Sequence, residues 1–209
     1  MTLQEVVARF NTTPFLFAGS GITRRYYGLP DWVGLLTHFA EKVKNDQFAF
    51  RYYESKVSEL EDSDKLPTIA SYIEKDFNEA WFNNLPGIRS ESENVQRSIA
   101  EGVSPFKAEI AEYINSISVV ENEYQEEVKK LQNIAKNNIS GVITTNYDCF
   151  FEILFDGYKT FIGQDELVFS QLQGVAEIYK IHGSANDAES IIITEQDYEK
   201  FNKSRKLII

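Results

Sequence analysis

The sequence has very few of the residues that form covalent or metal cross-links. Among its 209 residues there is one cysteine, Cys149, and there are two histidines. A single thiol excludes an internal disulfide and any zinc site made of several thiolates. Cys149 lies in the apolar stretch YDCFFEILF, which favours a packing role over a nucleophilic one.

Long apolar runs and an excess of positive charge are also absent. No stretch approaches the roughly 20 apolar residues of a membrane-spanning helix, and the N-terminal MTLQEVVARFN lacks the pattern of a secretory signal. The 21 basic residues are outnumbered by 32 acidic ones, giving a net charge of −11, which argues against broad nucleic-acid binding. We therefore expect a cytoplasmic protein without a membrane partner.

The residues that are abundant indicate a packed globular fold, with 43% hydrophobic and 13% aromatic residues. Short apolar runs alternate with helical patterns at both ends of the chain, which is typical of a parallel sheet. We predict strands within 15–18, 141–146, 158–162 and 176–184, and a further strand is possible at 190–194. The expected fold is α/β, a Rossmann-like parallel sheet flanked by helices, with a large all-helical insertion.

We treat residues 1–209 as a single domain. Its sheet parts are expected at about 11–30 and 139–195, and its helical insertion at about 31–138. Helical periodicity with Asp31 as an N-cap marks the start of the insertion. The predicted helices are 3–10, 31–45, 48–60, 66–84, 104–117, 121–138, 147–155, 165–173 and 195–206.

Three of the predicted strands end in polar clusters, AGSGIT, TTNYD and IHGS. Ligands of open parallel sheets bind at the carboxyl ends of the strands, so we expect the three clusters to share one pocket. Gly19 and Gly21 permit positive φ and close approach of a ligand to the backbone. Each cluster also has a plain structural reading, such as a helix cap from Thr144, Thr145 or Asn146, or a loop histidine at His182.

The ordered set AGSGIT, GLPDW, TTNYD and HGS resembles the NAD-binding domain of sirtuins. Sirtuins carry Gly-Ala-Gly-Ile-Ser, then Gly-Ile-Pro-Asp-Phe-Arg, then Thr-Gln-Asn-x-Asp, then His-Gly. The resemblance covers about 11–32 and 139–185. The positions that match are Gly19, Gly21, Thr23, Gly28, Pro30, Asp31, Asn146, Asp148, His182 and Gly183.

The departures from the sirtuin pattern point to one branch of these proteins. The paired zinc cysteines that usually follow His-Gly are missing, Val33 replaces the arginine, and about a hundred helical residues are inserted. This combination is similar to the sirtuin-like NAD hydrolases of bacterial antiphage defence. Such domains continue into a further strand that completes the adenosine site, so we expect this chain, ending in SRKLII, to lack its C-terminal strand.

The resemblance implies roles for the residues at the strand ends. Asn146 would hold a ribose hydroxyl or the attacking water, Asp148 would orient the ribose or the Asn146 loop, and His182 would act as a general base. NAD+ would be the substrate, with no metal. Arg24 and Arg25 would either neutralise pyrophosphate or lie solvated in a loop. The implied NAD contacts are Ala18, Gly19, Ser20, Gly21, Thr23, Asp31, Thr145, Gly183 and Ser184.

The predicted function is NAD+ glycohydrolysis to nicotinamide and ADP-ribose, used against phage by NAD depletion (abortive infection). An NAD-dependent protein deacylase and a non-catalytic NAD or ADP-ribose sensing or assembly module are the alternatives. We expect a homo-oligomer, with a partner protein or an additional domain controlling activity. Of the insertion's aromatic residues, most are expected in the core, and the excess could form a self-association face; they are Phe48, Phe50, Tyr52, Tyr53, Tyr72, Phe77, Trp81 and Phe82.

Overall fold

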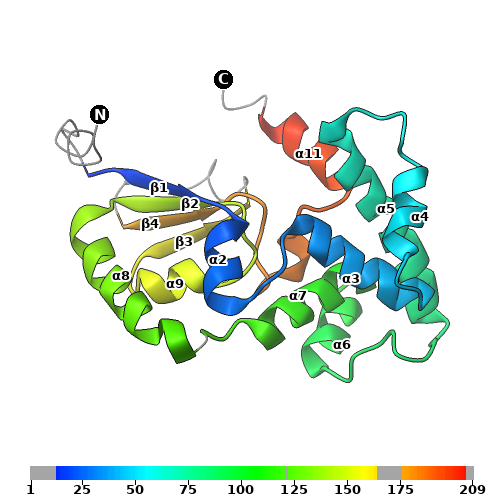
Figure 1. Cartoon of the computed structure of the whole chain (residues 1–209), viewed down its shortest axis with the longest axis horizontal. Helices are drawn as coiled ribbons and strands as arrows, with labels where there is room; N and C mark the ends of the chain where they lie inside the picture. The colour runs from blue at the N-terminus through cyan, green and yellow to red at the C-terminus, as the bar shows by residue number, and fades with distance from the viewer. Residues whose placement is uncertain (1–12, 121, 164–175, 206–209) are drawn as a thin grey trace.

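A parallel four-stranded sheet organises one half of the molecule (Figure 1). The computed structural model describes residues 13–120, 122–163 and 176–205. Within them the strand order is β1-β2-β4-β3, and every neighbouring pair is parallel. The predicted α/β class is therefore confirmed. The strands are β1 (Phe15–Ala18), β2 (Gly141–Thr144), β3 (Lys159–Ile162) and β4 (Glu177–Lys180).

The two inner strands form the buried centre of the sheet. Val142 of β2 pairs with Leu16 of β1 on one side and with Ile178 of β4 on the other. Val142 and Ile178 are fully buried. The edge strand β1 alternates between exposed and half-buried positions, and the edge strand β3 has one exposed residue, Lys159, and one buried residue, Phe161. This register places Ala18, Thr144 and Lys180 side by side at the carboxyl ends of their strands, so the segments that follow these residues start next to one another.

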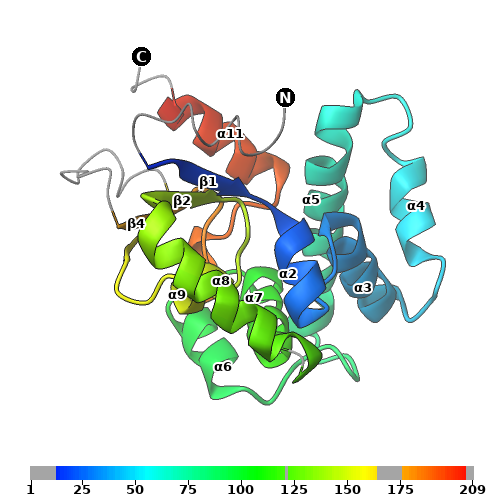
Figure 2. The same cartoon turned by 60° about the vertical axis from the view of Figure 1, so that its left-hand side comes forward.

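One face of the sheet is covered by three helices that come from distant parts of the sequence (Figure 2). Aromatic contacts join them, since Tyr26 of α2 stacks on Phe150 of α9 with 5.0 Å between ring centroids. Tyr26 also donates a hydrogen bond to Glu127 of α8. The three helices are α2 (Ser20–Tyr27), α8 (Gln125–Asn138) and α9 (Phe150–Leu154).

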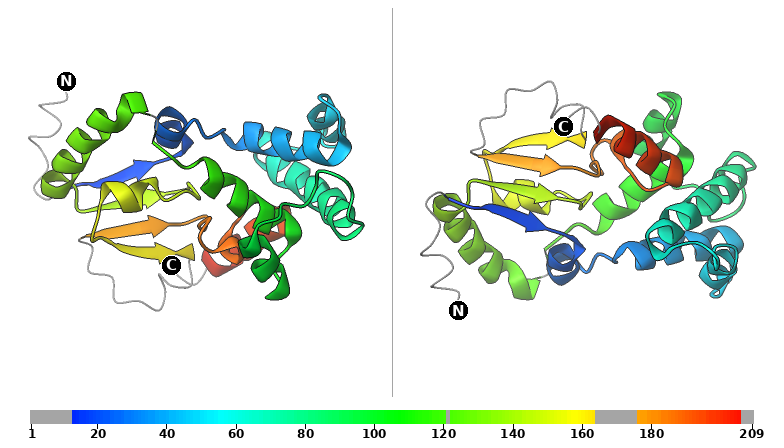
Figure 3. Two further views of the ribbon diagram at one scale, coloured as in Figure 1. Left: turned by 90° about the horizontal axis from the view of Figure 1, so that it is seen from below. Right: turned by 90° about the horizontal axis from the view of Figure 1, so that it is seen from above.

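The predicted helical insertion forms the other half, and the carboxyl ends of the strands point toward it (Figure 3). Asp31 caps its first helix as predicted, because its side chain accepts a hydrogen bond from Gly34 N at 2.8 Å. The last helix, α11 (Glu195–Arg205), packs against α5. Of the predicted insertion, about 31–138, the last helix α8 packs beside α9 in the sheet half. The remainder, called the insertion below, consists of α3 (Trp32–Lys44), α4 (Ala49–Ser55), α5 (Asp62–Phe82), α6 (Glu93–Ala100), α7 (Pro105–Ile117) and the 3₁₀ turn η1 (Asn122–Tyr124).

The insertion has an aromatic centre made by three helices. Phe39 of α3 lies 5.4 Å from Phe77 of α5 and 5.4 Å from Phe106 of α7, measured between ring centroids. All three side chains are buried. The insertion therefore has a packed interior of its own, continuous with the core under the sheet.

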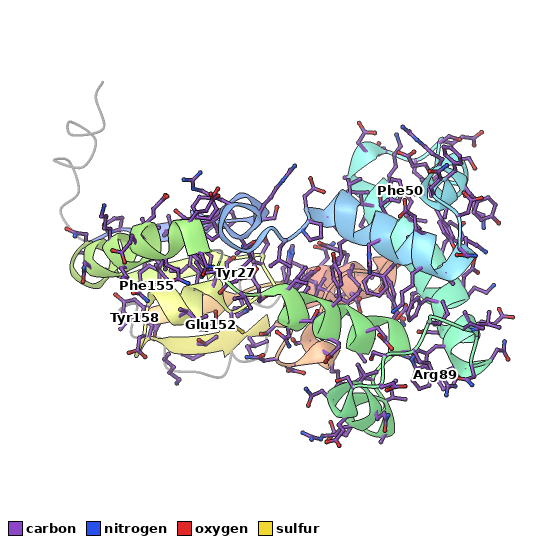
Figure 4. The ribbon with its side chains drawn as sticks, turned by 60° about the horizontal axis from the view of Figure 1, so that its bottom comes forward. Tyr27, Phe50, Arg89, Glu152, Phe155 and Tyr158 are labelled. Atoms are coloured by element: carbon purple, nitrogen blue, oxygen red, sulfur yellow. The ribbon has the colours of Figure 1, made fainter. Side chains whose placement is uncertain are left out.

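The expectation that most of the insertion's aromatic residues are buried is wrong. Three of the eight are buried, namely Tyr53, Phe77 and Trp81. Helical spacing alone cannot decide this, because the exposure of each ring depends on how α3, α4 and α5 pack against one another. Figure 4 shows Phe50 and Arg89 in this half, and Tyr27, Glu152, Phe155 and Tyr158 in the other. Four of the eight aromatic side chains of the insertion are exposed, namely Phe48, Tyr52, Tyr72 and Phe82.

The structure corrects one further local prediction and adds one helix, and two predicted helices lie outside the residues that it describes. Residues 190–194 are not a strand; after η2 (Ala188–Ser190) they run as an extended loop that buries Ile191 and Ile193. Helix α6 was not predicted. The predicted helices 3–10 and 165–173 lie outside the described residues. No helix in the described ranges is long and apolar enough to cross a membrane.

Candidate functional site

A cavity of about 230 Å³ lies at the carboxyl ends of β1, β2 and β4. Its polar wall comes largely from the segments that follow these strands, and its apolar wall comes from the segment before α3, from the insertion, from the segment after β2 and from α11. The polar lining residues are Ser20, Thr23, Asp31, Thr145, Asn146, Asp148 and His182. The apolar and aromatic ones are Leu29, Pro30, Trp32, Leu35, Ile114, Tyr147 and Tyr198.

Asn146 joins the end of β2 to the segment after β1. Its side-chain Nδ2 donates to Gly19 O at 3.1 Å and to Thr23 Oγ1 at 3.3 Å. The residue is 7% exposed. Because the amide nitrogen is engaged within the protein, Oδ1 is the side-chain atom that can serve a ligand, and it serves as an acceptor.

The Gly-Ser-Gly segment differs from the expected loop. Helix α2 begins at Ser20, Gly19 has φ −118°, and Gly21 is not among the residues with positive φ. The freedom to take positive φ is therefore not used here, because the chain passes directly from strand to helix. Among the described residues, a Cβ built on Gly21 would meet no atom within 4 Å beyond its own turn of helix. Gly21 thus borders open space, which fits the other expectation, close approach of a ligand to the backbone.

Asp148 is built into the start of α9. The helix begins at Phe150, three residues later than predicted, and its N-cap is Cys149; Asp148 Oδ1 accepts a hydrogen bond from Phe150 N at 3.0 Å, which holds the turn that leads into the helix. Neither Thr144, Thr145 nor Asn146 is the N-cap. Burial raises the pKa of Asp148, while hydrogen bonds from Phe150 N and Thr23 and the charge of Lys180 oppose that rise. The carboxylate therefore acts partly as structure and partly as cavity lining.

Lys180 is a buried cation beneath the site that sequence reasoning missed. It ends β4, and its side chain has no exposed surface. Its Nζ donates to the carbonyl oxygens of Tyr147 at 3.1 Å and Asp148 at 2.5 Å, and to Glu152 Oε1 at 2.9 Å. These bonds fix the backbone directly after Asn146. A lysine inside the apolar run EIYKIHG was the available signal.

His182 lies two residues after the end of β4, where its side chain packs against α11. Its Nδ1 is 3.5 Å from Tyr198 Oη, and its ring meets Tyr198 and Phe201 edge-on, each at 5.5 Å between centroids. Burial lowers the pKa of His182. The imidazole is therefore neutral near pH 7, the form in which it can accept a proton.

The remaining predicted contacts divide into two groups. Ser20, Thr23, Asp31 and Thr145 line the cavity with the three proposed catalytic residues. Among the described residues the other five predicted contacts are not part of its lining: Ala18, Gly19, Gly21, Gly183 and Ser184.

Gly183 has a structural reason to be glycine. Its φ is +95°, and a Cβ on it would lie 2.2 Å from Ser190 O. Ser184 next to it is 1% exposed, and its backbone N–H donates to Ser190 Oγ at 2.9 Å. The two residues thus hold the loop that follows His182 against η2.

Two arginines near the first loop are engaged with carboxylates. Arg24 lies 3.2 Å from Asp31, and Arg25 lies 2.8 Å from Glu127. Both arginines are exposed, and neither belongs to the cavity lining given by the described residues. Exposed pairs of this kind are weak, so Arg24 can exchange Asp31 for another anion at little cost.

One unsatisfied donor marks the cavity wall. Trp32 lines the cavity, and its buried indole Nε1–H has no hydrogen-bond partner among the described residues. A buried donor without an acceptor is costly, which makes a ligand acceptor at this point favourable. No group of three or more potential metal ligands occurs in the described ranges.

Part of the chain matches a known protein family. The family model of the SIR2-like domain matches residues 140–209, which hold β2, β4, α11 and the proposed catalytic residues Asn146, Asp148 and His182. No curated protein matches the chain. The match covers the C-terminal third of the chain and supports a sirtuin-like domain, and SIR2-like domains bind NAD.

Proposed function

We propose that this domain cleaves NAD+ into nicotinamide and ADP-ribose. In this reaction the bond between ribose C1′ and the nicotinamide nitrogen breaks, and its electron pair stays with the neutral nicotinamide that leaves. Water adds its oxygen to C1′ and gives up one proton. The protein has to hold the ribose, stabilise positive charge at C1′ and admit water.

The observation that carries the proposal is the meeting of Ser20, Asn146 and His182 in the lining of one cavity. They follow three different strands and are brought together by the parallel register. The carboxyl edge of a parallel sheet is where nucleotides bind. The open space beside Gly21 and the unpartnered Trp32 donor both suit a bound ligand.

Each polar group has a task consistent with its position. Asn146 Oδ1 accepts a hydrogen bond from a ribose hydroxyl or from the water, since Nδ2 is engaged with Gly19 and Thr23. His182 accepts the proton of that hydroxyl or water and passes it to solvent. Asp148 holds the Asn146 loop in place and, where ionised, offsets positive charge at C1′. The aromatic and aliphatic wall offers a dry place for the nicotinamide ring.

We extend the proposal to biology on the resemblance to antiphage NAD hydrolases. The sequence has a single cysteine, so the zinc module that shapes a peptide groove in sirtuin deacylases has no ligands here. This favours water over an acyl-lysine side chain as the nucleophile. A bacterial host that expresses the protein should lose NAD during phage infection, whereas a host that expresses His182→Ala should not.

The decisive experiment measures nicotinamide release from NAD+ by the purified protein. We expect nicotinamide and ADP-ribose in equal amounts, and no acceleration by an acyl-lysine peptide. His182→Ala and Asn146→Ala should each lose roughly 10²–10⁴-fold in rate. Peptide-dependent turnover with an acyl-ADP-ribose product would establish a deacylase instead. Binding of NAD+ without any release would establish a sensing module.

A further inference from the structure

Tyr198 of α11 is the residue that contacts His182 at a ring nitrogen. Its hydroxyl lies 3.5 Å from Nδ1, and the two rings meet edge-on. On its other side Tyr198 stacks on Trp32, with 5.8 Å between centroids. Tyr198 thus stands between the cavity's aromatic wall and its histidine, and it lines the cavity itself.

The helical insertion fixes where Tyr198 stands. Asp197, the residue before it, forms an ion pair with Lys107 of α7 at 2.7 Å, and both side chains are 13% exposed. Asp197 also accepts hydrogen bonds from Thr194 N at 3.0 Å and from Thr194 Oγ1 at 2.8 Å, and Thr194 Oγ1 in turn accepts from Asp197 N at 3.3 Å, which caps α11. Ser71 Oγ of α5 accepts a hydrogen bond from Glu195 N at 3.1 Å. The first turn of α11 is therefore tied to α5 and α7.

We propose that Tyr198 is a positioning residue for His182, held in place by the insertion through the Lys107–Asp197 pair. The proposal deepens the NAD hydrolase function and rests on it for its catalytic meaning. With Nδ1 facing the tyrosine hydroxyl, Nε2 is the nitrogen left to exchange a proton with the ligand. For Nε2 to accept a proton, Nδ1 must carry the ring hydrogen and donate it to the Tyr198 hydroxyl oxygen, and this is the tautomer that the contact would hold. The same contact restricts rotation of the ring.

The tyrosine is suited to this task because it keeps its proton. Burial, with a smaller contribution from the Asp197 charge, raises the pKa of Tyr198 to about 12. Its hydroxyl therefore stays neutral over the range in which His182 titrates. Phenylalanine in its place preserves the ring contacts with Trp32 and Phe201 and removes only the hydroxyl.

The first test reads the histidine ring directly and needs no activity. The chain has two histidines, so the side-chain ¹⁵N resonances of His182 and His38 can be separated with a His38→Gln variant. In the native protein we expect His182 shifts of a single dominant tautomer. In Tyr198→Phe they should move to values averaged between tautomers, with His38 unchanged. Identical His182 shifts in both proteins would overturn the proposal.

A matched pair of lysine variants tests the link to the insertion. Lys107→Met removes the buried partner of Asp197. Lys203→Met removes an exposed ion pair with Glu199, 3.5 Å apart, and both of these residues lie on α11, as Asp197 does. We expect the His182 shifts to move in the first variant and to stay in the second. Equal effects, or none, would contradict a positioning role for the Lys107–Asp197 pair.

Kinetics separates this proposal from the proposed function. Tyr198→Phe should lower kcat for NAD+ cleavage roughly tenfold with little change in KM, a part of the roughly 10²–10⁴-fold that a general base contributes. An unchanged kcat beside an inactive His182→Ala would overturn the positioning role alone. If the native protein does not cleave NAD+, the proposed function fails, and the ¹⁵N shifts still decide whether Tyr198 positions His182.

Discussion

The sheet half and the helical insertion use their buried polar groups differently. In the sheet half Asn146 and His182 line the cavity; Trp32 of the insertion lines it too, and its buried Nε1–H has no partner among the described residues. Inside the insertion the buried Glu109 is well satisfied. It accepts hydrogen bonds from Trp81 Nε1 at 3.2 Å and Ser90 N at 2.8 Å, and Lys42 lies 3.6 Å away.

This difference separates chemistry from support. A buried charge whose bonds are complete, like Glu109, holds elements together and has little left for a ligand. The groups around the cavity keep acceptors, a donor and a neutral imidazole available. The insertion therefore supplies walls and anchoring, while the strand ends supply the reactive groups. Variants in the two halves can break or sharpen this division.

The two histidines give the largest expected contrast. His182→Ala should reduce NAD+ cleavage by roughly 10²–10⁴-fold, because it removes the proposed proton acceptor. His38→Ala should leave the rate within about threefold, since His38 stacks on Tyr113 at 4.3 Å inside the insertion and does not line the cavity. Nicotinamide release under saturating NAD+ measures both. A comparable loss in His38→Ala would show that the insertion takes part in the chemistry.

Within the insertion, the free energy of unfolding should depend strongly on whether the mutated ring is buried or exposed. Phe77→Ala removes a fully buried ring between Phe39 and Phe106 and should destabilise the protein by about 3–5 kcal/mol. Phe82→Ala removes a ring that is 63% exposed on the same helix and should cost less than about 0.5 kcal/mol. Urea unfolding monitored by circular dichroism compares them. A large cost at Phe82 would mean that its exposed face is covered in solution by another copy of the chain or by a partner.

The sheet and its strand ends were predictable because their signals are local. Four short apolar runs, each closed by polar or glycine residues, predicted β1, β2, β3 and β4, and the rule for ligand sites in parallel sheets predicted one edge. Asp31 as a cap was also readable from its place before a helical period. These features depend on neighbours in sequence, which a single chain displays.

The rest depends on contacts between distant residues. Nothing around Tyr198 in EQDYEKF indicates that its hydroxyl faces His182, because that contact requires α11 to be tied to α5 and α7. Likewise, Asn146 Nδ2 proves to be engaged only when the end of β2 is placed beside Gly19. Which aromatic residues of α4 and α5 are exposed is decided by how those helices pack, and helical spacing does not record it.

A smaller effect is expected at Gly21, where stability and binding should move in opposite directions. Gly21→Ala adds a Cβ that meets no protein atom within 4 Å, in a helix where alanine is preferred. It should stabilise the free protein by about 0.4–1 kcal/mol. If NAD+ approaches the backbone here, the same methyl group should weaken NAD+ binding in calorimetry. Unchanged affinity would place the ligand away from α2.

The smallest expected effect is the pH dependence of stability, and it returns to the two histidines. Burial lowers the pKa of His182 in the folded protein, so below its ordinary value of about 6.5 the unfolded chain binds a proton more readily than the folded one. The stabilisation that a neutral His182 provides is therefore present above pH 6.5 and is lost as the pH falls through the folded pKa.

Burial raises the pKa of Asp148, which gives the pH dependence of stability a contribution of opposite sign, so the native protein alone does not isolate His182. The difference between native protein and His182→Gln does, and we expect the variant's free energy of unfolding to fall less between pH 7 and pH 5 (about the window set by that ordinary pKa). His38→Gln should change the slope less, because His38 remains exposed although burial of part of its ring also lowers its pKa. Urea unfolding at several pH values measures the free energy of unfolding of the native protein and of both variants. If His182→Gln and His38→Gln change its pH dependence equally, then His182 is not the more buried of the two histidines, which would contradict its place in the cavity.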